Sequence, residues 1–300
     1  MDTATLKTFI TIADCGSFSQ AADKLFLTQP AISKRIAQLE QELGTRLFDR
    51  IGRKTSLTQA GRLLHQRAQH ILLEIEDSKR EIANLSGEAS GSLALGTSHH
   101  ISLHRLPPVL RRYATQYPQV NLDIRFMDSE TACYGVQTGA LELAVITLPL
   151  EPAKEIRVKK IWTDPLCFVV GRSHPLARAT GTGNNKSSSV KLADLLAQPA
   201  ILPDEKTFTR QLLQRAIADA GEEVVKVSMS TNYLETIKML VTVGLGWSLL
   251  PQTMLDDELV TLNVKGVRLK RELGAVWHAG RTLSNACKAM LETLDASKST

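Results

Sequence analysis

Apolar residues recur at helical spacing in three short segments near the N-terminus. Each segment has one apolar face, which predicts a helix packed on one side. Ser17 and Thr28 stand where N-caps belong, and Pro30 falls in a first turn, where its missing N–H leaves no helical bond unmade. The pattern predicts a small three-helix core whose second and third helices form a helix-turn-helix. The apolar positions are Leu6, Phe9, Ile10 and Ala13; Phe18, Ala21, Ala22 and Leu25; and Ile32, Ile36, Leu39 and Leu43.

The third predicted helix leaves a polar face outside this core. Its small, hydrogen-bonding or cationic side chains could approach base edges and phosphates in a DNA major groove. An ordinary helical hairpin with a solvated polar face shows the same spacing, because helix-turn-helix geometry is a weak pattern by itself. The outward residues are Gln29, Pro30, Ser33, Lys34 and Arg35.

The segment from Gly44 to Gly61 is basic, with four cations and one anion. Apolar residues flank Gly52, which predicts a hairpin or wing with an exposed basic tip. Such a wing could follow the DNA backbone or place an arginine in a minor groove. A merely solvated charged face is the alternative. The charged residues are Arg46, Arg50, Arg53 and Lys54, with Asp49.

A helix of nearly thirty residues follows, starting at Thr58. Its apolar positions advance in steps of four and three, which is the seam of a coiled coil and requires a partner helix. We therefore expect a dimer, which would present two wings to one pseudo-palindromic site. A long helix packed on its own domain is the alternative. The seam residues are Leu64, Ala68, Ile71, Ile75, Ser78, Ile82 and Leu85.

After the Gly-Ser-rich break at residues 86–93, strand-like and helix-like runs alternate, as in an α/β domain. We predict strands at 93–97, 122–126 and 143–147, a run at 161–170 that enters a second lobe, and a return strand at 273–279. Helices are expected at 106–117, 208–221 and 232–244. Residues 180–189 indicate a flexible surface loop without chemistry.

Composition fits this plan. The 300 residues suffice for a small domain and a two-lobed one, and 43% hydrophobic content supports real cores. The net charge of +5 is mild, so the basic character concentrated at the wing favours a nucleic-acid footprint. No stretch of eighteen apolar residues and no signal-peptide layout is present. We therefore expect a cytoplasmic protein without a membrane partner.

Residues 1–61 resemble the winged helix-turn-helix of the LysR-type transcriptional regulators. The resemblance rests on LKTFITIADCGSFSQAADKLFLTQPAISKRIAQLEQELGTRLFDR, on the wing RIGRKTSLTQAG, and on the long helix that follows. It implies DNA-reading roles for Gln29, Pro30, Ser33 and Lys34 and for Arg50 and Arg53. Many relatives carry arginine where this chain has Lys34. Lysine lacks the planar fork for a bidentate base contact and suits a phosphate contact.

The rest of the chain resembles the same family through Pro107-Pro108, YPQV, GALELAVI, SHPLA and VTVGLGWSLLP. The resemblance implies a periplasmic-binding-protein-like effector domain of two lobes with the ligand between them. It gives a DNA-binding domain at 1–60, a dimerisation helix at 61–88 and an effector domain at 91–300. Lobe I would span about 91–162 and 267–300, and lobe II about 163–266. The family commonly forms homotetramers, and an activator would also contact RNA polymerase.

The segment TSHHISLH, residues 97–104, is the candidate effector site. It follows a strand and opens a helix, so it would present backbone N–H groups and hydroxyls that attract anions. By analogy with the family, threonines from elsewhere would close the site around a small anionic metabolite, either a carboxylate or a sulfur or phosphorus oxyanion. The candidate residues are Thr97, Ser98, His99, His100, Ser102, Thr147, Thr207 and Thr231.

Two other readings of these histidines stay open. They could be surface residues that cap the helix and bind nothing. A metal site formed by His99, His100 and His104 is the second, but adjacent histidines point apart and no clear carboxylate partner is near in the sequence. We expect no metal and no cofactor.

The cysteines Cys15, Cys133, Cys167 and Cys287 are widely separated, without zinc-binding spacing. A peroxide-sensing relative would hold a reactive pair in the second lobe, and no cysteine lies between Cys167 and Cys287. We expect no such thiol switch.

Catalytic motifs are missing: the sequence contains no P-loop, HExxH or GxSxG pattern, and the GLG of VGLGW lacks the third glycine of a dinucleotide site. We expect no enzyme. Two classes of function remain, a ligand-responsive DNA-binding regulator and a small-molecule-binding protein whose N-terminus only oligomerises. The four cations around Gly52 favour the regulator.

Overall fold

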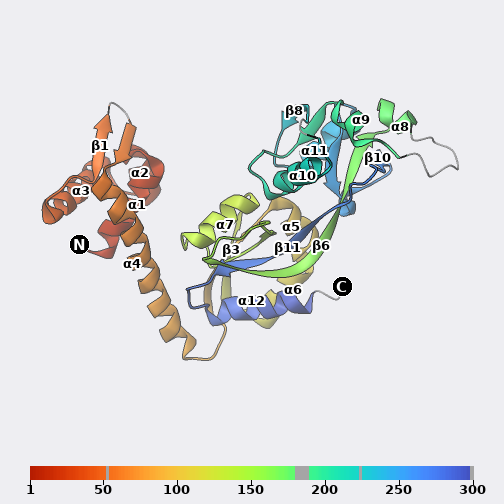
Figure 1. The fold of residues 1–300 in the computed structure, drawn as a ribbon. Helices are drawn as coiled ribbons and strands as arrows, with labels where there is room; N and C mark the ends of the chain where they lie inside the picture. Colours follow the sequence, from red (N-terminus) through yellow and green to blue (C-terminus); the bar gives the residue numbers. More distant parts are fainter. Residues whose placement is uncertain (52–53, 180–188, 223–224, 298–300) are drawn as a thin grey trace. The chain divides into compact units, whose positions relative to one another are not determined.

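The computed structural model describes residues 1–51, 54–179, 189–222 and 225–297. The chain divides between Ser86 and Gly87 into two compact units, each with its own hydrophobic core (Figure 1). The loop predicted at 180–189 falls outside the described residues except for its last position.

Short helices build the core of the N-terminal unit. They are α1 (Thr3–Cys15), α2 (Phe18–Leu25) and α3 (Gln29–Leu43). Ser17 caps α2 by accepting a hydrogen bond from the Gln20 N–H, whereas Thr28 caps α3 without a side-chain bond. Most of the predicted apolar positions meet in one cluster, which also takes in Ile12, whereas the predicted Leu43 is 41% exposed. The buried residues include Leu6, Phe9, Ile12, Phe18, Ala21, Ala22, Ile32, Ile36 and Leu39.

A hairpin follows this helical core. Strand β1 (Phe48–Ile51) pairs antiparallel with β2 (Lys54–Leu57), with Phe48 opposite Leu57. The Glu40 carboxylate of α3 accepts hydrogen bonds from the backbone N–H groups of Leu47, at 2.7 Å, and Phe48, at 3.3 Å. Because both of these apolar side chains are also buried, the base of the hairpin is anchored to the helix-turn-helix.

Helix α4 (Gln59–Asn84) packs on this unit at its start. Gly61 lies so close to the hairpin that an added Cβ would stand 2.1 Å from the Leu47 carbonyl oxygen, so glycine is required there. Ala68 is fully buried in the unit's core and Leu64 packs against the same cluster. This corrects the predicted seam, because Ala68 is already covered within a single chain.

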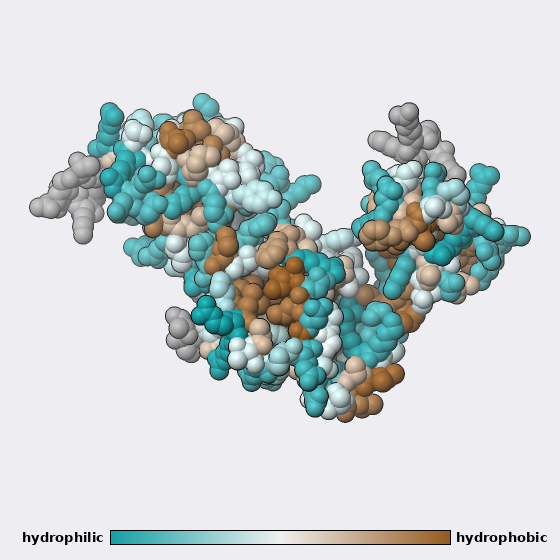
Figure 2. Space-filling view, turned by 180° about the vertical axis from the view of Figure 1, so that it is seen from behind, coloured by the Kyte–Doolittle hydropathy of each residue, from teal (hydrophilic) through white to brown (hydrophobic). Residues whose placement is uncertain are grey.

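The later part of α4 exposes its apolar side chains. Ile71, Ile82 and Leu85 are 38%, 71% and 86% exposed. Figure 2 shows hydrophobic side chains on the surface at the C-terminal end of this helix. A partner helix would therefore find its apolar contacts in this later part, and Leu64 and Ala68 contribute to the chain's own core.

The C-terminal unit contains a long mixed sheet. Strands β4 (Val120–Phe126), β3 (Gly91–Thr97) and β5 (Leu143–Thr147) run parallel, and β11 (Leu269–His278) joins them antiparallel to β5. Helices α6 (Leu106–Gln116) and α12 (Asn285–Ala296) cover one face of this part, and α7 (Ser129–Gln137) covers the other (Figure 1). These elements form lobe I.

Lobe II is built on the far half of β6 (Ile156–Gly171), which pairs with β9 (Ser248–Pro251) and β10 (Leu259–Leu262). A separate parallel pair, β7 (Ala200–Leu202) and β8 (Val227–Ser230), lies against the same core. The helices of this lobe are α8 (Pro175–Ala179), α9 (Leu192–Leu196), α10 (Phe208–Asp219), α11 (Leu234–Thr242) and the 3-10 turn η1 (Gln252–Met254).

Two long strands connect the lobes. β6 and β11 pair antiparallel from Ile156 opposite His278 to Leu166 opposite Leu269. Ile161 and Leu273 belong to the lobe I core, whereas Leu166 and Leu269 belong to the lobe II core. The chain therefore passes between lobes in the middle of these strands. Within the described residues, no helix is long and apolar enough to cross a membrane.

Candidate DNA-binding surface and effector pocket

Helix α3 presents the predicted recognition residues on its surface. Gln29, Pro30 and Lys34 are exposed and Ser33 is half-buried. Arg35 differs from these, because its Nη1 donates a 2.9 Å hydrogen bond to the Thr8 hydroxyl of α1. This residue therefore braces α3 against α1 with at least one of its N–H groups.

The wing carries the remaining predicted DNA contacts. Arg50 lies on β1 and Lys54 lies on β2, on either side of the hairpin tip. Arg53 lies outside the described residues.

One exposed residue near the helix-turn-helix was not singled out from the sequence. Phe26, in the turn before α3, has a left-handed backbone with φ of 55° and a side chain that is 96% exposed.

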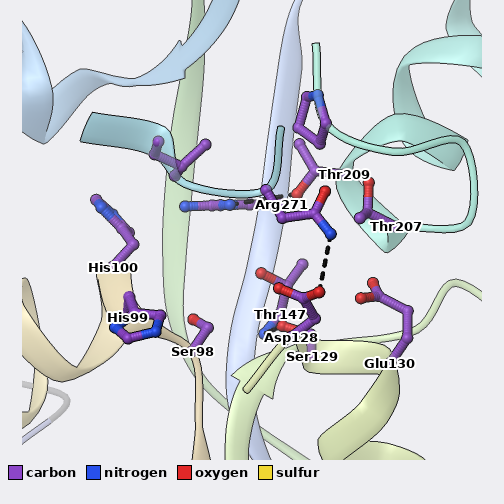
Figure 3. Close-up of a pocket in the computed structure, with 13 residues that line it drawn as sticks. Ser98, His99, His100, Asp128, Ser129, Glu130, Thr147, Thr207, Thr209 and Arg271 are labelled. Atoms are coloured by element: carbon purple, nitrogen blue, oxygen red, sulfur yellow. Dashed lines mark hydrogen bonds between the residues drawn. The ribbon is translucent and has the colours of Figure 1, made fainter. Parts of the chain in front are cut away.

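A pocket lies between the lobes of the C-terminal unit, with about 540 Å³ of empty space, part of it open to solvent. The lobe I residues lie just beyond the C-terminal ends of β3, β4 and β5, where α/β sheets bind ligands. Figure 3 shows side chains from both lobes facing this space. The lining residues are Ser98, His99, His100, Asp128, Ser129, Glu130 and Thr147 of lobe I; Pro203, Thr207, Thr209, Asn232 and Leu234 of lobe II; and Arg271 of β11.

Five of the predicted effector residues line this pocket: Ser98, His99, His100, Thr147 and Thr207. They come together because α5 (His99–His104) begins directly after β3, Thr147 ends β5, and Thr207 caps α10 by accepting a hydrogen bond from the Arg210 N–H.

The other three predicted residues are not among the lining side chains. The Thr97 hydroxyl is fully buried and donates to the Val145 carbonyl at 2.8 Å. The Ser102 hydroxyl donates to the His99 carbonyl at 2.6 Å, one turn back along α5. Thr231 stands just before the lining residue Asn232, and its hydroxyl accepts a hydrogen bond from the Tyr233 N–H. The hydroxyls of these three residues bond to the local backbone, and their role in effector binding stays a prediction.

Arg271 is the most important residue that sequence reasoning missed. It lies directly opposite Asp164 in the pairing of β11 with β6, and its Nε donates a 2.8 Å hydrogen bond to that carboxylate. Nη1 donates to the Thr209 hydroxyl at 3.2 Å. Its side chain is 6% exposed, and Nη2 is buried without a hydrogen-bond partner among the described residues. Both strands carry several charged residues, so nothing in the sequence singled out Arg271.

The charges around Arg271 are buried together. Burial lowers the pKa of the Arg271 guanidinium, and the Asp164 carboxylate opposes that shift. Asp164 is fully buried and also accepts a 3.4 Å hydrogen bond from Arg105 Nη2. One carboxylate therefore binds two guanidinium groups.

His100 is uncharged at neutral pH. Burial, and then the nearby positive charges of Arg271, His104 and Arg105, lower its pKa to about 3. The side chain is 4% exposed, and neither ring nitrogen has a hydrogen-bond partner within the described part of the chain.

Two contacts join the lobes across the pocket. The Asn232 amide of lobe II donates a 2.8 Å hydrogen bond to the Asp128 carboxylate of lobe I, drawn as a dashed line in Figure 3. The Glu130 carboxylate accepts a hydrogen bond from the Phe208 N–H at the start of α10. Burial raises the pKa of Glu130, although that hydrogen bond acts in the opposite direction.

A winged helix-turn-helix followed by a two-lobed α/β unit with an interlobe pocket defines a DNA-binding regulator with an effector domain. Residues 3–62 match the family described as bacterial regulatory helix-turn-helix protein, lysR family, and residues 86–298 match the LysR substrate binding domain. The chain belongs to the LysR family of transcriptional regulators, and it is not an enzyme.

Relatives and solved structures agree with this assignment. A probable RuBisCO transcriptional regulator of Synechocystis is 30% identical over 290 residues, which cover 93% of this chain and 81% of the relative. An uncharacterized HTH-type transcriptional regulator of Azotobacter vinelandii is 60% identical over 108 residues, covering 36% of this chain and 75% of that protein. Full-length CbnR in complex with its target DNA has the same fold, with a TM-score of 0.62 at 22% identity, over 99% of this chain and all of CbnR.

Proposed function

We propose that this regulator acts in the cytoplasm as a dimer or a dimer of dimers, and binds operator DNA through α3 and the wing. A small anionic metabolite held between the lobes would change the placement of the subunits and hence of the two winged helices. As an activator it would also contact RNA polymerase.

The observation that carries the anionic effector is the buried guanidinium of Arg271. Arg271 lines the pocket and its Nη2 has no hydrogen-bond partner among the described residues, so a ligand carboxylate or other oxyanion could accept a hydrogen bond from it. A buried charge-assisted bond of this kind is strong, and leaving the donor unpaired is unfavourable.

The rest of the lining favours a small polar molecule. Hydroxyls of Ser98, Thr147 and Thr209 provide donors and acceptors, whereas the carboxylates of Asp128 and Glu130 bind groups of lobe II. A hydroxylated carboxylate is the chemistry that this lining supports best.

The effector proposal is tested by a thermal-shift screen of small carboxylates, phosphates and sulfates with the full-length protein, freed of metal by a chelator. Any anion that binds the folded state raises the melting temperature. Ser98→Ala should lower the affinity for the best-binding anion by about tenfold, which corresponds to the loss of one hydrogen bond. Ser102→Ala is the matched control, because its hydroxyl faces the His99 carbonyl. Equal weakening by both variants, or by neither, contradicts the assignment.

The DNA proposal is tested by selecting bound sequences from a random library with the full-length protein. Gln29→Ala should lower the preference for the selected site over unrelated DNA by about 1–3 kcal/mol. Gln41, exposed in the last turn of α3, supplies the control variant Gln41→Ala. Unchanged specificity in Gln29→Ala would remove this residue from the recognition surface.

A further inference from the structure

We infer that His100, His104 and Glu235 form a binding site for a divalent transition-metal ion, placed between α5 of lobe I and α11 of lobe II. The site adds to the proposed anion-binding function and does not depend on it.

Two histidines of one helix and a glutamate from a distant part of the chain converge here. His100 and His104 are four residues apart on α5, so they project from the same face of the helix, and their ring centroids lie 4.6 Å apart. Glu235, at the start of α11, reaches them from the other lobe, with its Oε1 3.6 Å from His104 Nε2. One ligand atom from each residue lies within 4.8 Å of the others.

These spacings suit a metal ion after small side-chain rotations. Ligands around a tetrahedral zinc ion stand about 3.3 Å apart, given metal–nitrogen bonds of about 2.0 Å. The His104–Glu235 distance of 3.6 Å is already close to this value. Both of these side chains are 37–46% exposed, so they are able to rotate toward an ion.

His100 supplies an independent sign of a missing partner. Its imidazole is buried, with both ring nitrogens unpaired among the described residues, although a buried polar group is normally hydrogen-bonded. The neutral ring is the form that coordinates metal. A simple ion pair between His104 and Glu235 would leave both His100 nitrogens without a role.

The electrostatic surroundings allow a cation. Arg105 and Arg271 lie near His100 and oppose a positive ion. Asp164 binds both guanidinium groups, and Glu235 brings a second negative charge directly to the site. Two cations therefore face two anions before the ion arrives. Binding of a dication is therefore less favoured by charge here than in an acidic site. The affinity would depend mainly on the bonds between the ion and its three ligands.

The ligand set selects the class of ion. Two imidazoles and one carboxylate suit zinc, nickel or copper and do not suit magnesium or calcium, which prefer oxygen ligands. Three protein ligands leave a coordination position for water or an oxyanion. Since the ligands come from both lobes, a bound ion would hold α5 and α11 together and stabilise the arrangement of the two lobes described here.

Titration calorimetry of the full-length protein with zinc chloride tests the site, with cobalt chloride as a visible-absorption probe of the ligand geometry. We expect saturable zinc binding that magnesium chloride does not compete with. His104→Ala and Glu235→Gln should each weaken it at least about tenfold, and zinc should raise the melting temperature of the wild-type protein but not of Glu235→Gln.

His99→Ala is the matched control, because His99 is adjacent but packs against Phe126 and Tyr233. It should keep wild-type zinc affinity. Wild-type affinity in His104→Ala and Glu235→Gln would place the zinc on other histidines and overturn the inference. Absence of saturable binding to the wild-type protein would overturn it as well. Neither result bears on the anion screen, which uses metal-free protein.

Discussion

Asn232 bridges the two lobes by using both ends of its amide. Its Oδ1 accepts a 2.9 Å hydrogen bond from the Asp204 N–H in lobe II, and its Nδ2 donates to the Asp128 carboxylate of lobe I at 2.8 Å. The residue therefore links a loop of one lobe to the start of α7 in the other, next to the pocket.

Asn232→Asp should weaken the contact between the lobes, because it places two carboxylates against each other and keeps the acceptor for the Asp204 N–H. We expect a loss of about 1 kcal/mol in the free energy of unfolding, measured by urea denaturation, since the pair is exposed. The double variant Asp128→Asn with Asn232→Asp exchanges donor and acceptor and should recover most of that loss. Additive effects of the two substitutions would mean that the pair is not coupled.

Glu130 should make stability depend on pH. Burial raises its folded-state pKa above the ordinary 4.5, so the folded protein holds this proton more tightly than the unfolded chain. The stabilisation is complete below pH 4.5 and is lost as pH rises through the folded pKa. Glu130→Gln removes this dependence. Its free energy of unfolding relative to wild type should rise as pH is raised from below 4.5 through the folded pKa of Glu130. A relative stability that falls over this range would contradict the raised pKa.

Asp164→Asn should destabilise the effector unit strongly. The substitution leaves the buried Arg271 guanidinium without its countercharge, which typically costs about 3–5 kcal/mol. Urea denaturation measures the loss. Asp123→Asn is the control, because it breaks an Arg125 pair in which both side chains are at least 40% exposed. That change should cost under about 1 kcal/mol. Similar losses in the two variants would show that the buried pair has no special role.

Lys34→Ala should reduce the salt dependence of DNA binding. A lysine on a phosphate releases a counterion, so the slope of log affinity against log salt should become shallower by about 0.9. Fluorescence anisotropy across a salt series measures this slope. Lys79→Ala removes an exposed lysine that pairs with Glu76 on α4, and should leave the slope unchanged. An unchanged slope in Lys34→Ala would mean that Lys34 does not contact a phosphate.

Ile82→Asp should shift the protein from dimer toward monomer. Ile82 is 71% exposed, so the charge is tolerated in one chain but would be buried in a paired helix. Analytical ultracentrifugation gives the mass directly. Lys79→Ala, three residues earlier on the helix, is the control and is expected to stay dimeric. A dimeric mass for Ile82→Asp would mean that the dimer contact lies elsewhere.

Local patterns in the sequence were enough for part of the secondary structure, while elements such as α7, α12 and β7 to β10 were not predicted. Ser17 and Thr28 mark helix starts, and the strands and helices of the effector unit appear close to their predicted ranges. These features depend on residues near one another in the chain, because apolar periodicity and capping are local effects.

Packing between distant segments decided the rest. A heptad pattern shows that a helix has an apolar face but not which surface covers it, so Ala68 was assigned to a partner while the chain's own core buries it. Likewise a hydroxyl near a predicted pocket is free for a ligand only if no backbone group uses it, as the Val145 carbonyl uses that of Thr97.

The sequence by itself determined the family, the N-terminal helix-turn-helix and the α/β character of the rest of the chain. Only the tertiary structure decided which side chains meet at the candidate sites. Strand register set Arg271 opposite Asp164, and the approach of the two lobes brought Glu235 to His100 and His104. The physical reason is that charge pairing and metal coordination act over a few ångströms in space, whereas these residues are far apart along the chain.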